Sequence, residues 1–192
     1  ELAICYAHLD SIAKIVKEEI RKAGGVPFEV RTSAPSDFIT GAGKKGSYIL
    51  AGRDIIANDI EVQVEGALLD GMICLTSCDK TPPGHLMAAA RLNIPTILVI
   101  GGYQPAGEID GEPVDVEDLW GGSIGERFGK APKFPVSDMA ENAIRGPGVC
   151  AGMATANTMH SVVEALGMAL PGHAPVRANS PKMKDNARAA AR

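Results

Sequence analysis

Apolar side chains recur with helical spacing in two segments of the chain. In residues 9–23 they stand at positions 9, 12, 15, 16 and 20 and form one face, and Gly24-Gly25 ends the pattern. Residues 49–65 repeat this spacing, with apolar positions 55, 56, 60 and 64 facing inward. Residues 27–32 alternate between apolar and polar instead. The pattern therefore predicts two amphipathic helices with a short strand between them.

Two further runs, residues 71–76 and 95–100, are almost continuously apolar, which is typical of strands buried on both faces. A polar turn at 77–84 and a short helix predicted at 85–92 separate them. Strand, helix and strand in this order form a βαβ unit with a right-handed crossover. We therefore expect an α/β fold, a parallel-sheet three-layer sandwich built from βαβ units.

The other segments carry loops and one more helix. Residues 33–46 are rich in Ser, Gly and Lys and predict a loop that holds Asp37. Residues 103–135 contain many Gly, Pro and acidic residues, so we expect a surface excursion with at most one short helix. A glycine-rich turn at 144–153 then opens onto a helix predicted at 154–168.

The C-terminal segment begins like a helix and shows no signal to end it. Ser180 suits the N-cap and Pro181 the first turn, and strong helix formers follow without a C-cap. We expect residues 180–192 to be the start of a truncated helix. Residues 1–192 would then be a single α/β domain, the N-terminal part of a longer chain.

Composition narrows the class of protein. The chain has 192 residues, a net charge of −4 and 45% hydrophobic residues, which argues against disorder. No basic tract suggests nucleic acid, and Arg91 and Asn93 interrupt the best candidate for a membrane span. No basic segment precedes a signal-type apolar stretch at the N-terminus. We expect a soluble cytoplasmic protein whose four cysteines are reduced.

Candidate chemistry gathers in two turns. Cys78, Asp79 and Lys80 follow a buried strand, where ligands bind in open α/β sheets. Cys150 lies in the glycine-rich turn, and Cys5 precedes the first helix. Packing explains a mid-strand Cys74 best, while Cys78 and Cys150 remain open between packing and function. Asp37 could merely cap a turn, and the Asp79-Lys80 pair could be solvated. The residues alone predict a cleft lined by thiols and carboxylates.

Three segments resemble the dihydroxy-acid and sugar-acid dehydratases, a family that includes phosphogluconate-type enzymes. Residues 78–90 (CDKTPPGHLMAAA) are similar to the family's C-D-K-x-x-P-G-x-L-M-A-A segment. Residues 146–172 resemble its G-x-C-x-G-M-x-T-A-N-T-M…E-A-L-G-M-x-L-P-G segment, and residues 53–57 match a third. Cys5-x-Ala7-His8-Leu9 looks like the family's C-N-A-H-L. The match is collinear over nearly the whole chain.

The resemblance implies a cofactor set. Cys5, Cys78 and Cys150 would be the thiolate ligands of an iron–sulfur cluster, with [2Fe–2S] favoured over [4Fe–4S]. Three ligands on a two-iron cluster leave one iron with an open position, as a Lewis acid requires. Asp37 and Asp79 resemble the family's magnesium carboxylates. Lys80 resembles the lysine whose carbamylation supplies another oxygen ligand for Mg²⁺.

The implied reaction is the loss of water from a 2,3-dihydroxy acid or an aldonic acid, which gives a 2-keto acid in amino-acid or sugar-acid metabolism. Relatives are much longer, and their second domain supplies the serine base, so no catalytic residue is expected within this chain and the fragment alone would be inactive. A homodimer or homotetramer is also implied. Neither nucleic acid nor membrane is expected as a partner.

The chain also departs from the family pattern. Asp37 is followed by Phe38, where relatives have Gly, and residues 41–46 (GAGKKG) stand where relatives have a glutamate-containing stretch. Two alternatives therefore accompany the dehydratase hypothesis. One is a non-catalytic α/β module that keeps the fold and binds a metal or another ligand. The other is a structural domain in which all the cysteines are packed thiols.

Overall fold

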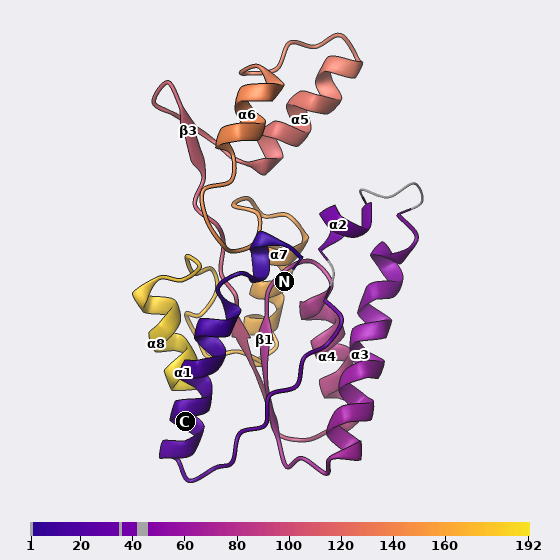
Figure 1. Ribbon diagram of the computed structural model, residues 1–192, viewed down its shortest axis with the longest axis vertical. Helices are drawn as coiled ribbons and strands as arrows, with labels where there is room; N and C mark the ends of the chain where they lie inside the picture. The colour runs from indigo at the N-terminus through magenta and orange to yellow at the C-terminus, as the bar shows by residue number, and fades with distance from the viewer. Residues whose placement is uncertain (1, 35, 42–45) are drawn as a thin grey trace.

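The computed structural model describes residues 2–34, 36–41 and 46–192 (Figure 1). None of the helices in these ranges is long and apolar enough to cross a membrane. The elements in chain order are η1 (Ile4–Tyr6), α1 (Leu9–Lys22), α2 (Asp37–Gly41), α3 (Tyr48–Gly66), β1 (Met72–Thr76), α4 (Thr81–Leu92), β2 (Thr96–Ile100), β3 (Gly107–Ile109), β4 (Glu112–Val114), α5 (Val116–Arg127), α6 (Val136–Asn142), α7 (Thr155–Ala165) and α8 (Pro181–Ala190).

The central sheet is parallel and small. β1 pairs with β2 in a register that runs from Met72 beside Thr96 to Thr76 beside Ile100. Beyond β2, Tyr103 forms parallel bridges with Val149 and with Arg177. The predicted α/β class with a parallel sheet and a βαβ unit is confirmed, although the sheet has only two strands within the described ranges.

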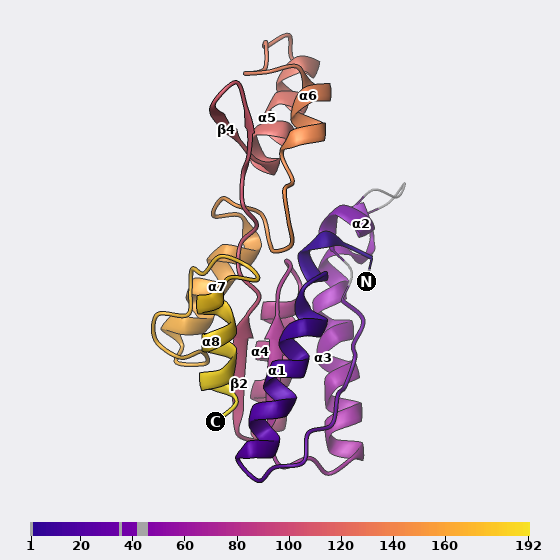
Figure 2. The same cartoon turned by 60° about the vertical axis from the view of Figure 1, so that its left-hand side comes forward.

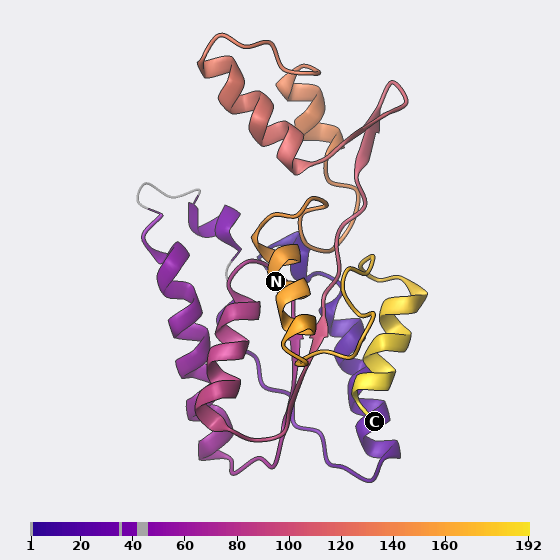
Figure 3. The same cartoon turned by 180° about the vertical axis from the view of Figure 1, so that it is seen from behind.

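Helices cover both faces of this sheet. α1 and α8 lie together on one side, and α3 and α4 lie on the other (Figures 1 and 2). α7 packs against α4. It lies in front in Figure 3, where the molecule is seen from behind. The main core joins β2 to α1, α7 and α8, and its most deeply buried members are Ile12, Leu98, Val99, Val163, Met183 and Ala187.

The predicted helix near the N-terminus is confirmed as α1, but the strand predicted at 27–32 is wrong. This segment forms no regular element, and Phe28 is exposed. Its charged side chains bind α1 instead: Glu29 pairs with Lys17, and Arg31 Nη2 lies 2.8 Å from Asp10 Oδ1. The alternation thus reflects ion pairs to a helix and not the two faces of a sheet.

α3 confirms the helix predicted at 49–65, whereas two expected loops are partly helical. α4 begins at Thr81, four residues before the predicted start, because Pro82 and Pro83 occupy its first turn, where no backbone N–H is needed. Asp37 was expected in a loop and instead begins the short helix α2. Residues 42–45 of that expected loop lie outside the described residues.

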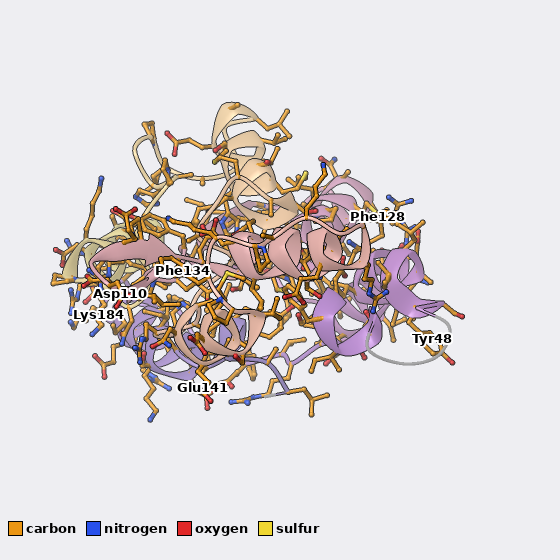
Figure 4. All side chains as sticks on the ribbon, turned by 90° about the horizontal axis from the view of Figure 1, so that it is seen from above. Tyr48, Asp110, Phe128, Phe134, Glu141 and Lys184 are labelled. Carbon is orange, nitrogen blue, oxygen red and sulfur yellow. The ribbon has the colours of Figure 1, made fainter. Side chains whose placement is uncertain are left out.

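The segment expected as an excursion with at most one short helix contains more regular structure. Asp110 and Gly111 have positive φ and form the turn of the β3–β4 hairpin, and α5 follows. Val114 packs with Met139 and Ala143 of the following segment in a small core of their own. Figure 1 shows this unit projecting from the end of the sheet where α2 lies. In the view from above, the projecting unit lies over the centre of the molecule, with Lys184 on one side and Tyr48 on the other (Figure 4).

Gly84 lets α3 and α4 pack closely, so replacing it should destabilise the protein. A Cβ at this position would lie 2.8 Å from Ile56 Cγ2 and 3.0 Å from the backbone oxygen of Arg53. We expect Gly84→Ala to lower the free energy of unfolding in urea by about 1–3 kcal/mol. Gly66→Ala is the matched control, since nothing lies within 4 Å of the added methyl group, and it should be neutral or stabilising. Equal stability of the two variants would contradict this packing.

Stability should also fall with acidification, because His85 is buried in its neutral form. Burial lowers the pKa of His85 from 6.5 to about 4. The unfolded chain then binds more protons than the folded protein between those values, so stability is lost as the pH falls from 6.5 towards 4, by up to about 1.4 kcal/mol per pH unit. In urea unfolding at several pH values, the free energy of unfolding of His85→Leu should depend less steeply on pH than that of the wild type. The same steepness in both proteins would refute the role of His85.

Candidate cofactor site

The loop between β1 and α4 holds Cys78 in a fixed position. The Ser77 backbone N–H donates to Thr81 Oγ1 at 2.9 Å, and that hydroxyl donates to the Cys78 carbonyl at 3.1 Å. Thr81 therefore closes the turn from both sides and also begins α4. As a result, Cys78 is held at the carboxyl end of β1, where open α/β sheets bind their ligands.

The N-terminal segment is fastened to the same loop and brings Cys5 to Cys78. Ser77 Oγ donates to the Cys5 carbonyl at 2.7 Å, and His8 Nε2 donates to the Gly101 carbonyl at 2.6 Å, at the end of β2. The Cys5 and Cys78 sulfur atoms lie 3.3 Å apart although 73 positions separate them in the chain. Both thiols are buried.

The two thiols share their protons unequally. Hydrogen bonding from Cys78 lowers the pKa of Cys5, and the same contact, together with burial, raises the pKa of Cys78. The Cys78 sulfur also lies 3.5 Å from Ser36 Oγ and 3.2 Å from Asp79 Oδ2. The pair can thus carry one negative charge more easily than two separate thiols could, and a thiolate is the form that binds metal.

Asp37 and Lys80 form a second polar pair beside the thiols. Lys80 Nζ lies 2.7 Å from Asp37 Oδ2, and the lysine side chain is only 10% exposed. A Cβ at Gly52 of α3 would touch the lysine stem at 3.6 Å. Burial raises the pKa of Asp37, which outweighs the lowering by Lys80. Asp37 Oδ1 is buried and has no hydrogen-bond partner within the described ranges, so it is free to accept from a ligand.

Cys150 approaches from the glycine-rich turn before α7. Gly148 has a φ of +116°, and a side chain there would clash with the Gln104 backbone nitrogen at 2.6 Å. Asn157 Nδ2 donates to the carbonyls of Cys150, at 3.0 Å, and Gly152, at 2.8 Å. Burial raises the pKa of Cys150 to about 12, with further contributions from the charges of Glu117, Asp79 and Cys5. Cys150 therefore shares the electrostatic environment of the other two thiols.

The structure brings most of the expected site residues to one end of the sheet, in two contacting groups. Cys5, Cys78 and Asp79 form one, and Asp37 and Lys80 form the other. Cys150 touches neither group. Across the described part of the chain, no group of three or more His, Cys, Asp or Glu side chains is arranged so that it could hold a metal ion as it stands. Cys74 packs in the main core, and burial raises its pKa to about 12.

The donor set nevertheless fits a thiolate-bound metal centre in part. Two thiolates on one tetrahedral metal ion lie about 3.8 Å apart when each metal–sulfur bond is about 2.3 Å. The 3.3 Å between Cys5 and Cys78 is close to that separation. The free Asp37 Oδ1 offers a hard oxygen ligand, which suits Mg²⁺.

Three residues near the thiols were missed in the sequence. Ser36 contacts Cys78, and His8 anchors the segment that carries Cys5. Glu117 places its carboxylate against Gly152, since a Cβ there would lie 3.1 Å from Glu117 Oε1. Of these three, only His8 could have been found from the sequence, because it belongs to the Cys5-x-Ala7-His8-Leu9 motif. Nothing in the spacing separates Ser36 or Glu117 from other loop and helix-start residues.

The fold and this site define an α/β domain with paired buried thiols and a partly buried carboxylate–lysine pair at the carboxyl end of a parallel sheet. The sequence profile of the dihydroxy-acid/6-phosphogluconate dehydratase N-terminal family matches residues 1–192, and the chain belongs to this family. A dihydroxy-acid dehydratase of Sulfurisphaera tokodaii is 41% identical over 188 residues, which are 98% of this chain and 33% of that protein. The chain thus spans about a third of the length of this relative.

Asn157 should control the conformation of the Cys150 turn. Asn157→Ala removes two hydrogen bonds to the turn and leaves two carbonyls without that donor. We expect a loss of about 1–3 kcal/mol in the free energy of unfolding and faster alkylation of Cys150, followed by mass spectrometry. Asn142→Ala also removes two hydrogen bonds, one to the Asp138 carbonyl and one from Arg145, but both are exposed and neither holds the Cys150 turn, so it should change neither quantity measurably. Equal alkylation rates in the two variants would contradict this role.

Proposed function

We propose that this chain is the cofactor-binding domain of a hydro-lyase that converts a 2,3-dihydroxy acid or an aldonic acid into a 2-keto acid. The observation that carries the proposal is the buried contact between Cys5 and Cys78, 3.3 Å apart, next to the Asp37–Lys80 pair. Membership of the dehydratase family and the dihydroxy-acid dehydratase relative support it.

Cys5, Cys78 and Cys150 would hold an iron–sulfur cluster, of the [2Fe–2S] type, as its three thiolate ligands. The lowered pKa of Cys5 favours a thiolate in the pair before any metal binds. Cys150 would be the third ligand, since it lies close enough to Glu117, Asp79 and Cys5 for their charges to add to burial in raising its pKa. A cluster held in this way would supply a Lewis acid for the departing hydroxyl group.

Asp37, Asp79 and Lys80 would hold Mg²⁺ and, through it, the substrate carboxylate. Asp37 Oδ1 offers an unused acceptor, and Asp79 stands beside Cys78, so the oxygen ligands adjoin the thiols. Lys80 would contribute after carbamylation, which turns an ammonium into an anionic oxygen donor. Its buried stem would keep that group directed at Asp37.

The reaction removes a proton from C2 and hydroxide from C3, and these combine as water. The resulting enol tautomerises to the 2-keto acid, so no net oxidation takes place. The residues of this chain would bind and orient the substrate and keep water from the buried thiols. The base at C2 would come from a serine outside this chain.

Replacing single cysteines tests the proposed ligand set. After anaerobic purification, we expect Cys5→Ala, Cys78→Ala and Cys150→Ala each to lose most of the bound iron and sulfide and the visible absorption of a cluster. Cys74→Ala is the matched control, because Cys74 is buried in the core and touches none of the other three thiols. The Cys74→Ala variant should bind as much iron per protein chain as the wild type. Iron loss in Cys74→Ala equal to that in Cys78→Ala would refute the assignment.

A further inference from the structure

Cys5 and Cys78 are placed to react with each other as well as with a metal. Both are free thiols, and their sulfur atoms lie 3.3 Å apart. A disulfide bond needs about 2.05 Å between the sulfur atoms, so they would have to approach by about 1.2 Å, which rotation of the side chains can supply. Cys74 packs in a separate core, and Cys150 contacts neither thiol. Within the described ranges, no other pair of cysteines is therefore placed to form a disulfide.

The backbone holds the two thiols together without using their sulfur atoms. Ser77 Oγ donates to the Cys5 carbonyl at 2.7 Å, and Thr81 closes the turn that carries Cys78. These hydrogen bonds can stay in place while the sulfur atoms approach each other. Groups that are already held side by side react far faster than groups that must first meet.

The surroundings of the thiol pair admit a small oxidant more easily than a large one. Tyr6 and a few partly buried apolar side chains pack around the two sulfur atoms. Cys5 lies in the three-residue helix η1, directly after Ile4, which is exposed. A brief local opening of this single turn would let hydrogen peroxide reach Cys5, whereas a bulky disulfide such as oxidised glutathione needs a wider opening.

We propose that hydrogen peroxide joins Cys5 and Cys78 in a reversible disulfide in protein without bound iron, and that this bond closes the thiol site to metal. The peroxide oxidises the Cys5 thiol to a sulfenic acid and is itself reduced to water. Cys78 Sγ then attacks Cys5 Sγ, so that the S–S bond forms and the S–O bond breaks. The departing hydroxide takes the Cys78 proton and leaves as a second water. The two thiols lose two electrons in all, which the peroxide gains.

The disulfide would make cofactor loading depend on the redox state of the pair. A thiolate binds metal and a disulfide does not, so the bond would withdraw two of the three proposed iron ligands. A dithiol such as dithiothreitol reverses the reaction by exchange and is itself oxidised to a disulfide. The inference goes beyond the proposed function, because the bond between the two sulfur atoms can form whether or not the chain serves a dehydratase.

The test uses the full-length protein, treated with a chelator to remove iron and then with hydrogen peroxide. After alkylation of the remaining thiols, mass spectrometry of tryptic peptides should find most of Cys5 linked to Cys78, and dithiothreitol should abolish the link. The tryptic peptide that contains Cys78 also contains Cys74, so Cys74→Ala is the matched control and should form the same link. In Cys78→Ala, Cys5 should instead persist as a sulfenic acid that dimedone traps.

Iron and sulfide uptake provides the second readout. The oxidised protein should take up little of the iron and sulfide that the reduced protein binds, and dithiothreitol should restore the uptake. Free Cys5 and Cys78 after oxidation, or a link from either to another cysteine, would overturn the inference. Undiminished uptake by the oxidised protein would also overturn it. If the reduced protein binds no iron, the proposed function fails, and the linked peptide alone decides the inference.

Discussion

The buried contact between Cys5 and Cys78 is the interaction on which the rest of the site depends. It joins the N-terminal segment to the β1–α4 loop, and the Ser77 hydroxyl reinforces it by donating to the Cys5 carbonyl. His8 adds a second anchor at the end of β2. Both anchors belong to the carboxyl ends of the two paired strands, so the parallel register of the sheet determines where the thiols meet. A shift of either strand would separate them.

Buried negative charge is the second constraint on this end of the molecule. Asp37 has a lysine partner on one oxygen and, within the described ranges, none on the other. Such groups are expensive unless cations or hydrogen-bond donors reach them. The proposed Mg²⁺ would compensate Asp37 and Asp79.

The sequence predicted the helix–sheet pattern well where apolar spacing was long and regular, as in α1, α3 and the β1–α4–β2 unit. It failed where local chemistry outweighed periodicity. The segment at 27–32 pairs its charges with α1, and the Asp110-Gly111 turn makes a hairpin in a region that looked irregular. For the site, motif residues such as Cys78 and Lys80 could be recognised. Ser36 and Glu117 could not, because only tertiary packing brings them to the thiols.

X-ray absorption at the iron edge of the anaerobically purified protein tests whether sulfur atoms of this chain bind iron. We expect a shell of sulfur neighbours at about 2.3 Å from iron, the usual length of a metal–thiolate bond. A second iron at short distance should accompany it, as in a two-iron cluster. A first shell made only of oxygen and nitrogen, with no sulfur and no neighbouring iron, would contradict it.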